Sequence, residues 1–249
     1  MIKGILLDIG GVLYEGDKVI DGAIKALEKL RKKYKIRFLS NTSRIPPLKL
    51  YEKLKEMGFD IKENEIFTAL NAAKLFLENE NANAYIIATD EAKEYFKDLK
   101  GEIKYVLVCD AYKNFTYDNL NQGFRYLENG AGFIATNKNK YFKDSDGLSL
   151  DAGGFVKCLE FASGKDAKIL GKPNCEFFNF AIKDMGLDKN EVIMVGDDII
   201  SDILGAKSCF LKTCLVKTGK FKESDLLKAK PDFVINSIAD LPKLLENLS

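Results

Sequence analysis

The sequence contains no histidine and no tryptophan among its 249 residues. The missing histidine excludes a Ser-His-Asp triad, a Cys-His pair, histidine metal ligands and a histidine general base. Catalysis by this chain therefore has to rely on carboxylates, lysine, hydroxyls, thiols or backbone groups, with any metal ion held by oxygen ligands.

Excess charge and long apolar runs are also missing. The 38 basic and 37 acidic residues give a formal net charge of +1, so there is no global attraction to nucleic acid or to an anionic membrane. No apolar run approaches the roughly 20 residues of a membrane span, and Asp8 interrupts the first one, so neither a transmembrane helix nor a signal peptide is predicted. We therefore expect a cytoplasmic protein that binds neither nucleic acid nor membrane.

Cysteines are few and show no metal-binding or redox spacing. They form no CxxC pair, and there is no histidine to complete a zinc set. An odd number in a chain of this size predicts reduced thiols in a cytosolic protein. We expect all five to serve as small buried apolar residues; they are Cys109, Cys158, Cys175, Cys209 and Cys214.

Short apolar runs alternate with stretches of helical spacing along the chain. Strands are expected at 2–8, 36–39, 85–88, 105–109, 133–135, 168–170, 192–195, 211–216 and 233–235. Helices are expected at 21–34, 48–57, 91–98, 116–128, 153–162, 174–185, 201–207 and 238–246. This alternation predicts an α/β fold with a mainly parallel sheet. Because ligands of such sheets bind outside the carboxyl ends of the strands, polar residues that follow strands are the candidates for a site.

The first such residue is Asp8, which ends a buried apolar run and is followed closely by Gly10 and Gly11. This arrangement lets a carboxylate face a ligand while the backbone approaches it, although a turn aspartate gives the same pattern. The second segment is Ser40-Asn41-Thr42. Its hydroxyls, amide and backbone N–H groups could bind a phosphate, although such residues also serve as turns and helix caps.

The third segment is Gly171-Lys172-Pro173, in which the lysine follows a predicted strand and precedes a predicted helix. Alone, Lys172 could be a solvated surface lysine. The segment is not a P-loop, because Pro173 stands where a serine or threonine is required.

The fourth segment places Asp197, Asp198 and Asp202 after another strand. Three acids within six residues repel one another unless a cation or hydrogen bonds compensate them. A divalent ion with oxygen ligands is a natural partner, and Mg²⁺ fits best. The alternative is a polar helix start with an aspartate as its cap.

Taken in this order, the four segments resemble the motifs of the haloacid dehalogenase superfamily of phosphatases. Further matching segments at 132–137, 150–154 and 171–174 resemble subfamily IIA, in which an α/β cap domain is inserted after the second motif.

The resemblance implies a Rossmann-like, doubly wound parallel-sheet core formed by residues 1–68 and 169–249. Residues 69–168 would form the α/β cap, with an exposed turn expected at 143–147. The implied partners are small phosphorylated substrates. The resemblance is also compatible with a homodimer, and the oligomeric state stays open.

The resemblance also implies a role for each motif. Asp8 would be the nucleophile that becomes an aspartyl phosphate, and Lys172 would orient it and neutralise the transferring phosphate. The other implied residues are the Mg²⁺ ligands Asp8, Gly10 (through its carbonyl), Asp197 and Asp202, with Asp198 nearby, and the phosphate-binding Ser40, Asn41 and Thr42. These roles are chemically consistent, because a carboxylate that attacks an anionic phosphate needs cations between the two.

The sequence departs from the family at Gly10, where a second aspartate usually protonates the leaving group and later activates water. General acid–base catalysis contributes about 10²- to 10⁴-fold. We therefore expect weak activity on alkyl phosphate esters and better activity on pyrophosphate, phosphoramidates and aryl phosphates, whose leaving groups need less help.

The alternative is a weak or inactive protein of the same fold that binds phosphate or a protein partner. No strand is followed by GxGxxG, which argues against a dinucleotide-dependent oxidoreductase.

Overall fold

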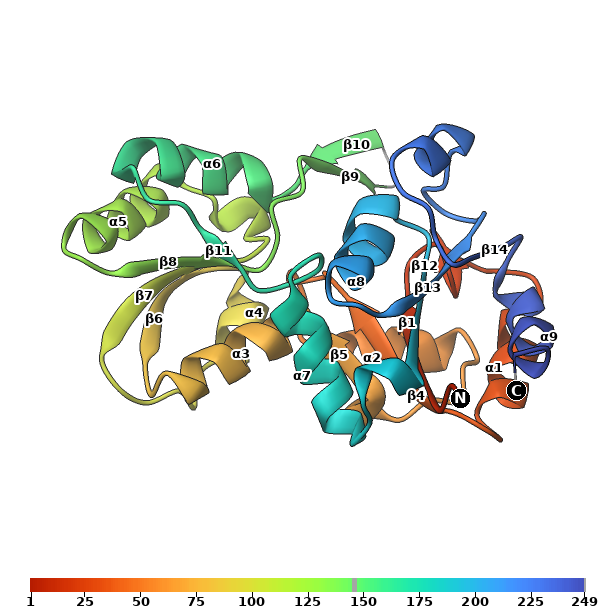
Figure 1. Cartoon of the computed structure of the whole chain (residues 1–249). Helices are drawn as coiled ribbons and strands as arrows, with labels where there is room; N and C mark the ends of the chain where they lie inside the picture. The colour runs from red at the N-terminus through yellow and green to blue at the C-terminus, as the bar shows by residue number, and fades with distance from the viewer. Residues whose placement is uncertain (145–146, 249) are drawn as a thin grey trace. The chain divides into compact units, whose positions relative to one another are not determined.

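The computed structural model describes residues 1–144 and 147–248, and this part of the chain divides into two compact units. The first unit contains Met1–Ser40, Tyr51–Phe67 and the residues from Lys172 onward. The second unit contains Asn41–Leu50 and Thr68–Gly171. Each unit is an α/β structure with its own sheet (Figure 1).

The first unit is built on a six-stranded sheet. In spatial order its strands are β14 (Phe233–Ile235), β13 (Lys212–Val216), β12 (Val192–Gly196), β1 (Gly4–Asp8), β4 (Lys35–Ser40) and β5 (Ile66–Thr68). The β1 strand pairs in parallel with both β4 and β12. The chain moves outward from β1 through β4 to β5, then returns to the other side of β1 at β12 and moves outward again. The sheet is therefore doubly wound, as predicted, with its topological switch point between β1 and β12.

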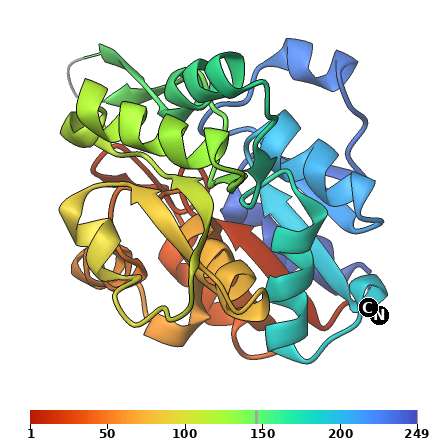
Figure 2. The same ribbon diagram turned by 90° about the vertical axis from the view of Figure 1, so that its left-hand side faces the viewer.

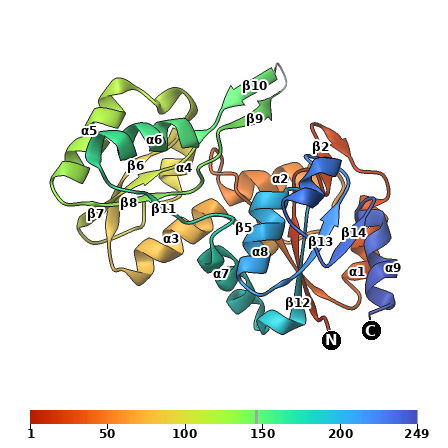
Figure 3. The same cartoon turned by 45° about the horizontal axis from the view of Figure 1, so that its top comes forward.

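The β1 and β12 strands lie at the centre of this sheet and are buried on both faces. Every residue of both strands is buried, as expected for parallel strands covered by helices. One pair of helices, α1 (Ala23–Leu30) and α9 (Leu241–Glu246), packs together on one face. Another pair, α7 (Cys175–Met185) and α8 (Gly205–Ser208), packs on the opposite face (Figure 3).

The second unit has a four-stranded parallel sheet. Its strands in spatial order are β11 (Lys168–Ile169), β8 (Gly132–Ala135), β7 (Ile103–Val108) and β6 (Asn83–Ile87). Its helices are α3 (Ala69–Asn79), α4 (Asp90–Glu94), α5 (Tyr117–Glu128) and α6 (Ala152–Ser163). One buried cluster includes residues of α3 and α4, and a second buried cluster includes residues of α5 and α6. The sheet therefore has a core on each face. Figure 2 shows α5 and α6 side by side.

Several elements were not predicted from the sequence. They are β5, α3, and the antiparallel hairpins β2 (Tyr14–Glu15) with β3 (Lys18–Val19) and β9 (Tyr141–Asp144) with β10 (Gly147–Leu150). The helix expected at 48–57 is α2 (Pro47–Glu56), and the helix expected at 201–207 is a π-helical segment at Ile199–Leu204 followed by α8. The turn expected at 143–147 includes residues 145 and 146, which lie outside the described residues.

A disulfide corrects the expectation of five reduced, buried thiols. Cys175, at the start of α7, is bonded to Cys209, which directly follows α8, and their Cα atoms are 5.4 Å apart. Packing of α7 against α8 brings together two cysteines that are 34 residues apart in the sequence. Cys109 and Cys214 are free and buried as expected, whereas Cys158 is free but exposed.

Within the described ranges, no helix combines the length and the apolar character needed to cross a bilayer.

Candidate active site

Two aspartates lie at the carboxyl edge of the central strands, where the topology predicts a site. Asp8 is the last residue of β1, and Asp197 directly follows β12. Leu7 pairs with Val195, so the two strands end at the same level. Both carboxylates therefore lie at the switch point, and both residues are buried.

A third aspartate joins them from the π-helical segment. Asp202 is fully buried, and Asp8, Asp197 and Asp202 each offer a carboxylate oxygen within 4.8 Å of the others. Gly196 at the end of β12 makes room for this arrangement, because a Cβ at that position would be 2.3 Å from the carboxylate of Asp202. We call Asp8, Asp197 and Asp202 the carboxylate cluster.

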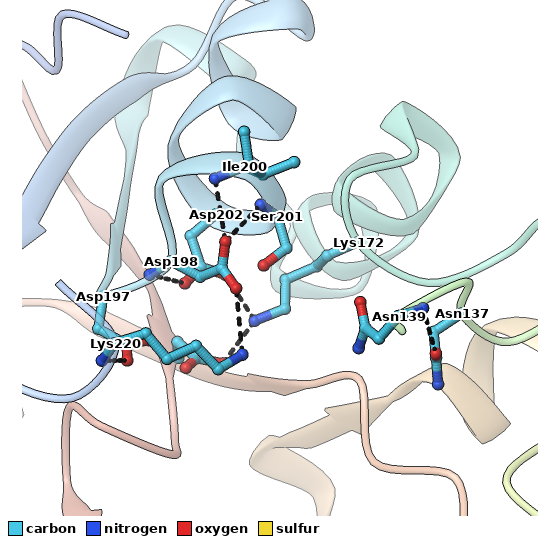
Figure 4. Close-up of polar contacts among 10 residues, drawn as sticks. Asn137, Asn139, Lys172, Asp197, Asp198, Ile200, Ser201, Asp202 and Lys220 are labelled. Carbon is cyan, nitrogen blue, oxygen red and sulfur yellow. Dashed lines mark hydrogen bonds and ion pairs between the residues drawn. The ribbon is translucent and has the colours of Figure 1, made fainter. Parts of the chain in front are cut away.

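Lys172 supplies a buried positive charge to the carboxylate cluster. Its ammonium forms ion pairs with Oδ1 of Asp8 and, at 2.7 Å, with Oδ1 of Asp202 (Figure 4). The side chain is only 4% exposed, so the reading of Lys172 as a surface lysine is wrong.

The carboxylate cluster has more negative than positive charge. Burial, together with the charges of Asp8 and Asp202, raises the pKa of Asp197 to about 8. Burial and the charge of Asp8 raise the pKa of Asp202 to about 7, although Lys172 opposes this change. Burial lowers the pKa of Lys172, but the charges of Asp202 and Asp8 outweigh it, so this pKa is raised. These shifts reflect repulsion among buried carboxylates, which a divalent cation with oxygen ligands would relieve.

Asp198 lies beside the cluster but has a different set of partners. Its Oδ1 accepts hydrogen bonds from the backbone N–H groups of Ile200 and Ser201, each at 3.0 Å, so it caps the π-helical segment. Its own N–H donates to Oδ2 of Asp202 at 3.1 Å. The cap expected as an alternative for this acidic segment is therefore present at Asp198, whereas Asp197 and Asp202 belong to the carboxylate cluster (Figure 4).

Lys220 is a site residue to which sequence reasoning assigned no role. Its N–H donates to Oδ2 of Asp197 at 2.7 Å, and its ammonium is 3.1 Å from Oδ2 of Asp198. Desolvation by the neighbouring residues lowers the pKa of Lys220, but the charge of Asp198 outweighs it, and Asp197 and Asp8 add to the resulting increase. The available signal was the segment Lys217-Thr218-Gly219-Lys220, which follows the end of β13.

The three residues expected to bind phosphate are divided between the two units. Ser40 ends β4, next to β1, and Asp8 pairs with Leu39 in this register. Asn41 and Thr42 belong to the second unit. There, a Cβ on Gly171 would be 2.7 Å from Oδ1 of Asn41, so this close approach requires glycine before Lys172.

Gly10 and Gly11 differ in why they are glycine. Gly11 has a φ of +77°, and a Cβ there would be 2.2 Å from Oδ2 of Asp197. Gly10 is exposed, and its backbone is not in the left-handed region. A Cβ at this position would have no heavy atom within 4 Å. The position usually held by the acid–base aspartate is therefore open space.

A doubly wound α/β core with an aspartate at the end of its first strand, ion-paired to a buried lysine, has the architecture of the phosphatases that the motifs predicted. A family model described as haloacid dehalogenase-like hydrolase matches residues 5–102, and a second one, described as HAD-hydrolase-like, matches residues 169–241. The chain belongs to the haloacid dehalogenase-like hydrolases.

Curated relatives cover nearly the whole chain. Phospholysine phosphohistidine inorganic pyrophosphate phosphatase of Bos taurus is 35% identical and covers 98% of this chain and 94% of the relative. Haloacid dehalogenase-like hydrolase domain-containing protein 2 of Homo sapiens is 39% identical and covers 92% of this chain and 90% of the relative. The structure of a p-nitrophenyl phosphatase from Archaeoglobus fulgidus matches with a TM-score of 0.90 and 28% identity over 98% of this chain and 99% of that one. The predicted family, fold class and hydrolase class are thus confirmed.

Proposed function

We propose that this protein is a Mg²⁺-dependent phosphatase that works through an aspartyl-phosphate intermediate on small phosphorylated compounds with good leaving groups. The observation that carries this proposal is the buried cluster of Asp8, Asp197 and Asp202 around the ammonium of Lys172 at the switch point. Residues 1–68 and 169–249 would be the catalytic core and residues 69–168 the cap, as the sequence predicts. This division differs from the two compact units at Asn41–Leu50, which belongs to the second unit.

In this proposal Asp8 is the nucleophile. One of its carboxylate oxygens attacks phosphorus, the bond from phosphorus to the leaving group breaks, and its electron pair stays on the leaving group. Water then attacks phosphorus of the aspartyl phosphate, the bond from phosphorus to the Asp8 oxygen breaks, and the proton of the water leaves with the phosphate or passes to solvent, which restores the carboxylate. Lys172 holds Asp8 in place and neutralises the transferring phosphoryl group.

The carboxylate cluster fits Mg²⁺, because it offers hard oxygen ligands and its raised pKa values show uncompensated negative charge. Asp8, Asp197 and the carbonyl of Gly10 would hold the ion. When bound, Mg²⁺ would stabilise negative charge on the transferring phosphoryl group. Asp202, which the family resemblance implies as a further ligand, would instead act mainly by holding Lys172, because its two oxygens already accept from that ammonium and from the N–H of Asp198. Ser40, Asn41 and Thr42 remain the proposed phosphate-binding residues.

The substrate class follows from Gly10. With no carboxylic acid there, the leaving group has to depart without a proton from that position. Pyrophosphate, phosphoramidates and aryl phosphates meet this condition better than alkyl esters do. The names of the relatives, which mention pyrophosphate, phospholysine, phosphohistidine and p-nitrophenyl phosphate, support the same class.

A phosphate-release assay tests this proposal. Pyrophosphate, imidodiphosphate, p-nitrophenyl phosphate, a sugar phosphate and a nucleotide would be compared with and without Mg²⁺, with Asp8→Asn as the matched control. We expect Mg²⁺-dependent release from the first three compounds, and none by the control. Tight phosphate binding without turnover would instead support the alternative of an inactive binding protein. A sugar phosphate that matches or exceeds pyrophosphate in kcat/KM would refute the assigned substrate class.

Gly10→Asp tests the missing acid directly. The space and backbone at this position admit a side chain, so the variant is expected to fold. We expect kcat/KM on the sugar phosphate to rise by about 10²-fold, the lower end of general acid–base contributions. An unchanged rate in a variant with wild-type stability would contradict the role assigned to this position.

A further inference from the structure

The segment 217–221, which we call the β13 loop, is held by hydrogen bonds to Gly11 and to Asp197 of the carboxylate cluster. The hydroxyl of Thr218 donates to the carbonyl of Gly11 at 2.5 Å, and the N–H of Lys220 donates to Oδ2 of Asp197 at 2.7 Å. Gly219 has a φ of +67°, and a Cβ there would be 2.1 Å from Oδ2 of Asp197. The side chain of Lys220 therefore starts from a fixed point next to Asp197.

The two lysines of the site have different surroundings. The side chain of Lys172 is 4% exposed and is engaged by Asp8 and Asp202. The side chain of Lys220 is 68% exposed, and its ammonium pairs with Asp198, whose side chain is 25% exposed (Figure 4). A solvent-exposed ion pair of this kind is weak, so the ammonium can exchange its partner for an incoming anion at little cost.

The leaving-group side of the site has a specific chemical need. Gly10 has no side chain to supply a proton, so an oxygen that departs as an anion depends on the cations and hydrogen-bond donors around it. A lysine with an ordinary pKa near 10.4 is a cation at neutral pH, which suits it to this task and makes it a poor proton donor.

We propose that Lys220 determines substrate specificity by binding the leaving phosphate of diphosphate substrates, such as inorganic pyrophosphate. This inference rests on the proposed phosphatase function. As Asp8 attacks one phosphorus, the bond from that phosphorus to the bridging oxygen breaks and the electron pair moves to this oxygen. The departing phosphate takes no proton from the enzyme, and its additional negative charge is neutralised by the ammonium of Lys220. A p-nitrophenolate leaving group spreads its charge over its ring and needs this ammonium much less.

The test is the ratio of kcat/KM on pyrophosphate to kcat/KM on p-nitrophenyl phosphate, which reports on the first chemical step. We expect Lys220→Met to lower this ratio at least tenfold, mainly through pyrophosphate, and Lys220→Arg to retain most of it. Lys217→Met is the matched control, because Lys217 lies in the same loop but pairs with Glu223. Its ratio should equal that of the wild type.

A binding measurement complements the rates. Methylenediphosphonate, which cannot be hydrolysed, should inhibit p-nitrophenyl phosphate hydrolysis with an inhibition constant about tenfold higher in Lys220→Met. Equal losses on both substrates, or an unchanged ratio and inhibition constant in a variant with wild-type thermal stability, would overturn this inference alone. Absence of phosphate release by the wild type from either substrate would overturn the proposed function as well.

Discussion

The ion pairs of Lys172 link two carboxylates that would otherwise repel each other inside the protein. Its ammonium contacts Asp8 and Asp202, and all three residues are buried. Removing one member of a buried charged group leaves the others uncompensated, which costs about 3–5 kcal/mol. Lys172 therefore serves both the stability of the core and the proposed chemistry, and the two contributions can be separated.

Lys172→Met is expected to lower the free energy of unfolding by about 3–5 kcal/mol and phosphate release by at least about 10²-fold. Adding Asp202→Asn removes one of the uncompensated charges, so the double variant should regain part of the stability. It should regain none of the activity, because Asp8 still lacks its cation. Urea unfolding and phosphate release measure the two effects. Recovery of activity in the double variant would show that Lys172 acts only as a structural partner of Asp202.

The raised pKa of Asp197 predicts how stability and metal binding depend on pH. The pKa is about 8 in the folded protein and about 3.9 in an unfolded chain, so the folded state binds the proton more tightly. The stabilisation from this group is fully present below about pH 4 and is lost as the pH rises through about 8.

Because Mg²⁺ competes with protons for the carboxylate cluster, the rise in Tm on adding Mg²⁺ should be larger at pH 8 than at pH 6. Thermal unfolding with and without MgCl₂ checks this expectation. Asp197→Asn should reduce the pH dependence of the Mg²⁺ effect, and the remainder would come from Asp202, whose pKa is about 7. An equal shift at both pH values would mean that Asp197 does not take part in binding the ion.

The absence of a side chain at Gly10 should also affect the second half of the reaction. The aspartate usual at this position activates the water that attacks the phosphoenzyme, so hydrolysis of aspartyl phosphate should be the slow step here. With p-nitrophenyl phosphate we expect a burst of about one p-nitrophenol per site, followed by slower steady turnover. Rapid-mixing measurements would show the burst, Asp8→Asn should lack it, and Gly10→Asp should reduce it while raising the steady rate. Steady turnover that depends strongly on the leaving group would be inconsistent with this assignment.

At the scale of elements, the disulfide links the two helices behind the site. Cys175 lies three residues after Lys172, and Cys209 follows α8, which directly continues the segment that carries Asp202. A crosslink closing a loop of this length stabilises a protein by about 2–4 kcal/mol. The double variant Cys175→Ser/Cys209→Ser should lose about this much in urea unfolding, and a reductant should have the same effect on the wild type. Cys158→Ser, which changes an exposed free thiol, should leave stability unchanged; a wild-type protein insensitive to reductant would contradict the structural role of the bond.

The elements predicted correctly are those with a strong local signal. The central strands β1 and β12 are short apolar runs that end in aspartates, and burial on both faces accounts for that pattern. The β5 strand and α3 were missed because they follow each other without a turn, and Thr68 both ends the strand and caps the helix. The β9–β10 hairpin was missed because the side chains of β10 are largely exposed, as the 71% exposure of Leu148 and Leu150 shows, so burial imposes no alternation on that strand.

The same reasoning explains which site residues could be found from the sequence. Asp8, Lys172 and Asp197 were identified because each follows or ends a predicted strand, and the carboxyl ends of parallel strands share one edge. The role of Lys220 could not be derived, because it depends on a glycine turn that brings its backbone to Asp197. The pairing of Cys175 with Cys209 depends on how two helices pack, for which the sequence carries no local signal.

At the scale of the whole molecule, the doubly wound topology accounts for a site built from distant segments. The first unit consists of three separate stretches of chain, and its sheet brings residues from the first and last of them to the β1–β12 edge. The fold class and family were predictable because four motifs occur in the order of this topology. The division of the chain into core and cap, the cytoplasmic location and the homodimer remain predictions.

The contrast between neighbouring glycines also bears on how this enzyme can change. A Cβ on Gly11 or Gly219 would clash with the carboxylate of Asp197, so almost any replacement there would disturb the fold of the site. A Cβ at Gly10 would meet no heavy atom within 4 Å, and its φ is not positive, so packing does not restrict the side chain at this position. Mutational tolerance should therefore be high at the position that, under the proposed function, most affects the range of substrates. If the proposed substrate class is correct, a single codon change at Gly10 offers natural selection or a protein engineer a route toward a broader range of phosphate esters.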